Sequence, residues 1–149
     1  MGNCDIYGGA WRWIIKASDG TVIKLRVFII HIKEVGFSPF GGVNFDVKIT
    51  GGVSTQYVPE EFKKAVASKP LFPLVPSELP LDGWELVDIV EFKPAVIEED
   101  FASSKGTFRI RVVAEPVMAS RNMNYKSIDG EPVYWISWVT KISWKPLKG

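Results

Sequence analysis

Few residues in this chain of 149 residues could act as a nucleophile, a general base or a metal ligand. The chain has one histidine, His31, and one cysteine, Cys4. A serine or cysteine nucleophile needs a base within hydrogen-bond reach, and the spacing identifies no partner for His31. A lone histidine in a strand is more often a packing residue. The sequence therefore predicts no catalytic residues and favours a protein that is not an enzyme.

Motifs for metals and cofactors are equally scarce. One thiol and one imidazole cannot build a zinc site rich in cysteine or histidine, so only a carboxylate run such as Glu98-Glu99-Asp100 could hold a hard cation. We interpret that run as a solvated turn. The glycine pairs match neither the dinucleotide fingerprint nor the phosphate-binding loop, and they indicate bends in strands. These pairs are Gly8-Gly9, Gly41-Gly42 and Gly51-Gly52. We predict no metal and no cofactor.

Binding of a polyanion is the chemistry that the sequence favours. Several basic residues lie among aromatic residues, and this mixture is typical of proteins that bind single-stranded nucleic acid. The candidate binding residues are Arg12, Lys16, Lys24, Arg26, Arg109, Arg111, Arg121, Tyr125, Trp135, Lys141 and Lys145. We expect the cations to contact phosphate and Trp135 to stack on a base.

The charges are distributed unevenly along the chain. Lys and Arg number 18 against 17 Asp and Glu, and the net charge of +1 is too small to attract a polyanion to the whole molecule. Residues 1–58 carry six cations and four anions, residues 59–105 carry five and ten, and residues 106–149 carry seven and three. The net charges are therefore +2, −5 and +4. The acidic segment of the same chain, or of a second subunit, could cover the basic residues.

Two other functions stay open. Six tryptophans are many for a chain of this length, and rings such as Trp11, Trp13, Trp138 and Trp144 could line a β-barrel that carries an apolar small molecule. The third reading is a protein-protein interaction module whose basic face meets an acidic partner. A homo-oligomer is also compatible with the sequence. Interior rings around an empty cavity would favour a carrier, whereas a filled core with Trp135 exposed beside Lys141 would favour a surface binder.

The elements that position these residues begin with a long hairpin. Two runs rich in Trp, Ile and Val flank Ser18-Asp19-Gly20, and a three-residue loop with glycine in the left-handed conformation is a common hairpin connection. This loop predicts pairing of residues whose numbers sum to 38. Trp11, Trp13 and Ile15 then share a buried face with Val27, Leu25 and Ile23. The other face places Arg12 opposite Arg26, which costs a few tenths to about 1 kcal/mol unless an anion compensates.

The remaining elements predict a mainly β protein. Alternation of apolar and polar residues indicates strands at 43–50, 83–92, 106–115 and 132–145. A short helix from Pro59 to about Ser68 and an extended proline-rich strap over 70–76 complete the chain. We expect one domain over residues 1–149, built on an antiparallel, strongly coiled sheet that is barrel-like or two-layered. Within it, residues 59–105 form an acidic, proline-rich, insert-like segment.

Composition predicts a cytoplasmic location. The longest uninterrupted apolar run is the four residues 27–30, which is too short for a membrane span or a signal peptide. The single cysteine fits a reducing compartment. One Gln, four Asn and three Met resemble the depletion of labile residues in proteins of heat-loving organisms.

Overall fold

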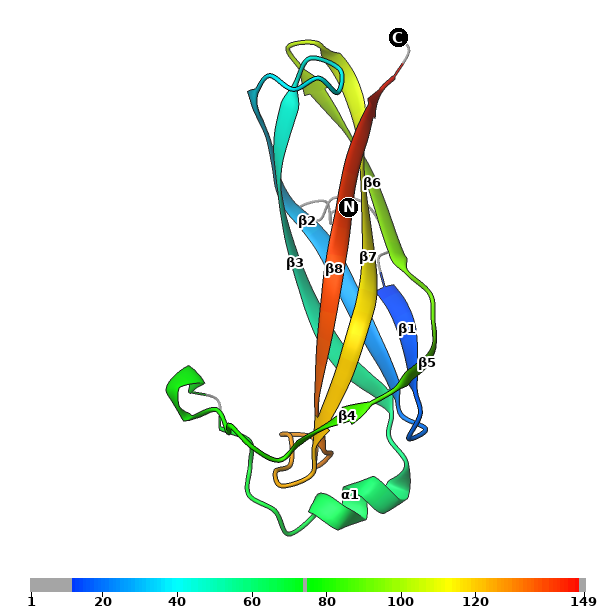
Figure 1. Ribbon diagram of the computed structural model, residues 1–149, viewed down its shortest axis with the longest axis vertical. Coiled ribbons are helices and arrows are strands. Elements are labelled where there is room, and N and C mark those ends of the chain that lie inside the picture. The colour runs from blue at the N-terminus through cyan, green and yellow to red at the C-terminus, as the bar shows by residue number, and fades with distance from the viewer. Residues whose placement is uncertain (1–11, 74, 148–149) are drawn as a thin grey trace, which may run out of the picture.

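The computed structural model describes residues 12–73 and 75–147, which form two antiparallel sheets and one short α-helix. The first sheet has the strand order β3-β2-β1-β5, and the second is built around β7 (Figure 1). The strands are β1 (Arg12–Ala17), β2 (Val22–Gly36), β3 (Asn44–Tyr57), β4 (Trp84–Val87), β5 (Ile89–Phe92), β6 (Ala95–Ser103), β7 (Gly106–Asn122) and β8 (Val133–Pro146). The helix α1 (Glu60–Val66) lies at one end, and a 3-10 turn, η1, covers Pro76–Glu78. The mainly β, antiparallel fold with one helix is confirmed.

The register of the first hairpin is also confirmed. β1 and β2 pair Trp13 with Leu25, Ile15 with Ile23 and Arg12 with Arg26. Gly20 closes the loop at φ +92°, a conformation that favours glycine. The predicted pairs that involve residues 1–11, Trp11 among them, lie outside the described residues.

The two sheets face each other across an apolar core. Four hairpin residues, Ile15, Ile23, Leu25 and Val27, are fully buried in it, as the register predicted. The second sheet contributes Phe108, Ile110 and Val112 from β7. This alternation of buried residues along the strands decides which side chains point outward.

Within the described residues the two sheets do not close into a barrel, so of the two expected forms the structure has the two-layered one. β4 pairs with one end of β7, β5 crosses to pair with β1 in the first sheet, and β6 returns to pair with the other end of β7 (Figure 1). On the opposite side β3 pairs with β2 and β8 pairs with β7, and no backbone ladder joins β3 to β8 within the described ranges. The molecule is a two-layer sandwich.

Two local expectations are wrong. The run Glu98-Glu99-Asp100 lies in β6 instead of a turn, because Glu98 and Asp100 form cross-strand ion pairs with arginines of β7. The strand expected over 83–92 is interrupted at Asp88, where the chain passes from one sheet to the other. There Ser18 donates its backbone N–H to the Asp88 carbonyl over 2.8 Å, which ties the crossing to the hairpin loop.

Candidate functional site

The outward surface of the first sheet gathers cations from three strands. Lys24 and Arg26 point outward from β2, because side chains alternate along a strand and their neighbours on β2 are buried. Those neighbours are Ile23, Leu25 and Val27. Lys16 lies on β1, opposite Val22 of β2. Lys93 directly follows β5, and its backbone N–H donates to the Ile14 carbonyl of β1. We call Lys16, Lys24, Arg26 and Lys93 the basic face.

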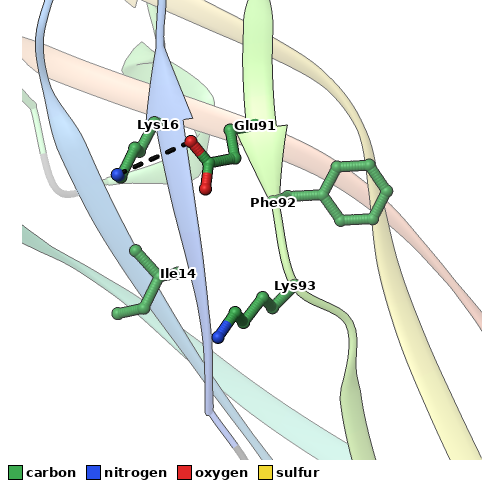
Figure 2. A pocket seen from close by; sticks show the side chains of 5 residues that line it. All are labelled: Ile14, Lys16, Glu91, Phe92 and Lys93. Carbon is green, nitrogen blue, oxygen red and sulfur yellow. Dashed lines mark ion pairs between the residues drawn. The ribbon is translucent and has the colours of Figure 1, made fainter.

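A shallow hollow of about 240 Å³ lies within the basic face. Ile14 forms its apolar part, and Lys16, Glu91 and Lys93 form its polar part. Figure 2 shows the side chain of Phe92, the fifth residue of the lining, pointing away from the two lysines. The hollow therefore combines two ammonium groups with a small apolar surface.

The basic face holds far more positive than negative charge. Glu91 is the single acid in β1, in β5, in residues 22–30 of β2 and in residues 50–57 of β3. Its carboxylate lies 3.5 Å from the Lys16 ammonium. Among the described residues, Lys24, Arg26 and Lys93 have no carboxylate within ion-pair distance. Arg12 stands opposite Arg26 in the strand register.

The outward surface of the second sheet carries matched charges instead. Arg109 donates two hydrogen bonds to Asp100, at 2.9 and 3.2 Å, and Arg111 donates one to Glu98 at 3.3 Å. The hydrogen bond from Arg109 lowers the pKa of the Asp100 carboxyl and the same contact raises the pKa of the guanidinium. Lys141 pairs with Glu115 at 3.2 Å. Of the candidate cations on this surface, Lys145 alone has no ion pair with a described residue.

Arg121 lies in a polar network that links the two sheets. Its guanidinium contacts Asp19 of the hairpin loop at 2.9 Å and Glu85 of β4 at 2.8 Å, and the side chain is 17% exposed. It also lies 4.8 Å from the centre of the Phe62 ring. Partial burial opposes its charged form, but the hydrogen bond to Glu85 and the nearby carboxylates outweigh burial and raise its pKa. The donors of Arg121 are therefore used within the molecule.

Tyr134 completes this network. Its hydroxyl donates to Asp19 at 2.9 Å and lies 2.8 Å from the hydroxyl of the buried Thr21. Burial is the main reason that the pKa of Tyr134 rises to about 12. We call Asp19, Thr21, Glu85, Arg121 and Tyr134 the inter-sheet clamp.

The candidate aromatic residues Trp135 and Tyr125 lie away from the basic face. Trp135 is 55% exposed on the outward surface of the second sheet and meets Trp84 edge to face, with ring centres 6.0 Å apart. Phe72 contacts both Trp84 and Tyr125 at 6.0 and 5.7 Å. The structure thus separates Trp135 from the cations of the hairpin.

Sequence reasoning missed one member of the basic face, Lys93, and one aromatic residue beside it, Phe28. Lys93 was not identified because its position depends on the pairing of β5 with β1, which no local pattern predicts. Phe28 was recognised as part of the hairpin but not as a binding residue. It is two residues from Arg26 along β2, on the same outward surface, and it is partly exposed.

The described residues show neither a metal-binding cluster nor a helix that could span a membrane, and the chain matches no known protein. Within residues 12–73 and 75–147 no group of three or more His, Cys, Asp or Glu side chains is arranged to hold a metal ion. No helix in this part of the chain is long and apolar enough to cross a membrane. Comparisons of the chain with protein-family models, curated proteins and solved structures find no match.

Proposed function

We propose that this protein is a non-enzymatic binding module that recognises single-stranded nucleic acid through the basic face. One observation carries the proposal: Lys24, Arg26 and Lys93 share an outward surface with a single acid, Glu91, which Lys16 already neutralises. A net charge of +1 does not attract a polyanion to the whole molecule, but a local excess of cations does.

The register of the hairpin adds an energetic argument. Arg12 and Arg26 are directly opposed, and like charges in that position destabilise a strand pair by a few tenths to about 1 kcal/mol. We therefore expect a phosphate bound beside Arg26 to offset this cost.

The surroundings of the cations fit nucleotides better than a structureless polyanion. Phe28 offers an aromatic ring beside Arg26, and aromatic side chains on a sheet surface are common platforms for unpaired bases. The neighbouring part of β3 presents uncharged polar groups, Thr50, Ser54 and Gln56, that can hydrogen-bond to bases or sugars. Phe28 therefore replaces Trp135 as the proposed stacking residue.

The core favours surface binding over an interior carrier. Phe108, Ile110, Val112, Ile23 and Leu25 are each at most 1% exposed and fill the space between the sheets. Trp138 and Trp144 pack against this core as partly buried residues. In a carrier these tryptophan rings would line a cavity, whereas here they pack against other core residues.

Titration of a labelled oligothymidylate at two salt concentrations tests the proposal. We expect binding that weakens with salt, with a log-log slope of roughly −2 to −3 for three or four phosphate contacts at about 0.7 each. Arg26→Ala should reduce the magnitude of that slope by about 0.7. The matched control is Arg111→Ala, which removes an arginine that is already paired with Glu98 and should leave the slope unchanged.

Phe28→Leu tests the stacking contact. The substitution should weaken binding by about 1–3 kcal/mol while leaving the salt slope unchanged. Absence of binding at low salt, or binding that does not respond to salt, would overturn the proposal. Tight binding of polyglutamate with no binding of the oligonucleotide would instead assign the basic face to an acidic protein partner.

A further inference from the structure

Glu91 is an acid that lies among the cations of the basic face. It is paired with Lys16 across the β1–β5 ladder, and Lys93 lies two residues further along the chain. The backbone N–H of Lys93 donates to the Ile14 carbonyl, and Ile14 lies opposite Lys24 of β2. One row across the sheet therefore holds a lysine on either side of Ile14, and the neighbouring row holds the pair of Lys16 and Glu91.

The Glu91 carboxylate has unused capacity to accept hydrogen bonds. One of its oxygens, Oε1, lies 3.5 Å from the Lys16 Nζ, which is longer than an ordinary hydrogen bond of about 2.7–3.2 Å. Figure 2 shows the second oxygen directed away from Lys16. No other described residue bonds to this carboxylate. Because an ionised carboxylate only accepts hydrogen bonds, a ligand that satisfies it must bring a donor.

A phosphate held by Lys24 and Lys93 brings a sugar close to this carboxylate. Two strand spacings, about 9.5 Å, separate the backbones of these lysines, and both long side chains can reach a phosphate above Ile14. Glu91 lies two residues from Lys93 on the same surface, roughly 7 Å along the chain. In a nucleic acid each phosphate is flanked by sugars. We therefore expect a sugar of the bound strand to lie beside Glu91.

We propose that Glu91 accepts a hydrogen bond from a ribose 2′-hydroxyl, so that the basic face selects RNA over DNA. Within a strand the 2′-hydroxyl is the one hydrogen-bond donor of the sugar-phosphate backbone, and DNA lacks it. For DNA the carboxylate adds only repulsion from phosphate, whereas for RNA a charge-assisted hydrogen bond offsets that repulsion. This inference rests on the proposed function, because it names the nucleic acid that the same surface binds.

The pairing of Glu91 with Lys16 matches the chemistry of a hydroxyl. A 2′-hydroxyl both donates and accepts a hydrogen bond. The carboxylate of Glu91 accepts, and the neighbouring ammonium of Lys16 donates. Donors on the base edges match this position less well, because they differ from base to base and lie away from the phosphates. Every ribonucleotide carries a 2′-hydroxyl, so the contact is independent of base sequence.

Two oligonucleotides that differ only in the sugar test the inference on the full chain. Oligouridylate and oligodeoxyuridylate of equal length carry the same bases and phosphates, so both should give the same salt slope. We expect the ribonucleotide to bind about tenfold more tightly, because it makes one more charge-assisted hydrogen bond. Salt-dependent binding without this preference would overturn the inference and leave the proposed function standing. Absence of binding by both would overturn the proposed function as well.

Glu91→Ala should remove the preference without a loss of binding. The substitution frees Lys16 and removes repulsion from phosphate, so affinity for oligodeoxyuridylate should rise about twofold to fivefold while the preference for the ribonucleotide disappears. Glu115→Ala is the matched control, because Glu115 also pairs with a lysine, Lys141 at 3.2 Å, but on the second sheet. The control should keep the wild-type preference. A Glu91→Ala variant that keeps it too contradicts the role of Glu91.

A 2′-fluoro oligouridylate separates the hydrogen bond from the shape of the sugar. Fluorine preserves the pucker of ribose but cannot donate a hydrogen bond, so we expect this oligonucleotide to bind as weakly as the deoxyribonucleotide. Binding as tight as that of the ribonucleotide would overturn the inference. Oligocytidylate and oligodeoxycytidylate should show the same preference as the uridine pair. A preference for one base in both RNA and DNA would instead assign Glu91 to a base edge.

Discussion

The outward surfaces of the two sheets have similar numbers of cations but differ in how many acids neutralise them. On the second sheet, acids of β6 and β7 pair with Arg109, Arg111 and Lys141. On the first sheet, the residues that face Lys24 and Arg26 on the neighbouring strands include no acid, and those two cations have no ion pair within the described part of the chain. A basic residue on a strand is therefore available to a ligand only when the neighbouring strand does not supply an acid.

The inter-sheet clamp gives the largest expected effect. Arg121→Ala would leave Asp19, whose side chain is 9% exposed, without its charged partner. Because an uncompensated, largely buried carboxylate is costly, we expect the free energy of unfolding to fall by about 3 kcal/mol. Urea denaturation measures this loss. Arg109→Ala, which removes an exposed ion pair, should change stability little, and equal losses in the two variants would contradict the distinction.

Tyr134 should make the clamp sensitive to alkaline pH. Its pKa of about 12 in the folded protein lies above the ordinary value of about 10. The neutral hydroxyl therefore contributes stability that is complete below pH 10 and is lost as the pH rises towards 12, up to about 2 kcal/mol after allowance for partial exposure. Unfolding experiments from pH 9 upward should show this decline. Tyr134→Phe is expected to be less stable at pH 7 but to lack this part of the decline.

An acid introduced into the basic face should neutralise its cations, as the acids of the second sheet neutralise theirs. Ile14 lies opposite Lys24 and lines the hollow beside Lys93. Ile14→Glu should lower oligonucleotide affinity about tenfold and reduce the magnitude of the salt slope by at least one contact, about 0.7. Ile14→Gln has nearly the same shape without the charge, so it serves as the control. If both variants bind equally well, the local charge of this face does not govern binding.

Removal of acids from the second sheet is the converse experiment and should have the smallest effect. Glu98→Gln combined with Asp100→Asn frees Arg111 and Arg109 from their partners. We expect oligonucleotide affinity to rise a fewfold, with a slope steeper by up to about 1.4, for two added contacts. Unchanged binding would mean that an oligonucleotide bound to the basic face does not also contact this surface.

Local patterns were sufficient for much of the fold. The loop Ser18-Asp19-Gly20 predicted the pairing of Arg12 with Arg26 because a three-residue loop allows one register. Alternation predicted β7 and β8, although β7 continues to Asn122, beyond its predicted end at Glu115. The helix was predicted from Pro59 and the acids that follow it, and it ends at Val66. Each of these features depends on residues close together in the sequence.

The candidate site depended on contacts between distant segments. Eleven residues were predicted to bind, and their types did not distinguish Arg26 from Arg111. What distinguishes them is the neighbouring strand: β6 supplies acids to one, and β3 supplies none to the other. The acidic run at 98–100 was misinterpreted for the same reason, since the arginines that face Glu98 and Asp100 across the ladder come from a different strand, β7.

The sequence by itself determined which residues alternate between core and solvent, where the first hairpin turns and how it is paired, because these depend on side-chain period and loop length. Tertiary structure alone decided that the sheets form a sandwich open between β3 and β8, that Trp135 lies apart from the hairpin cations, and that Arg121 joins the two layers. These outcomes depend on the order of strands within each sheet. Strand order is set by the burial of apolar surface over the whole chain, and a local pattern carries no information about it.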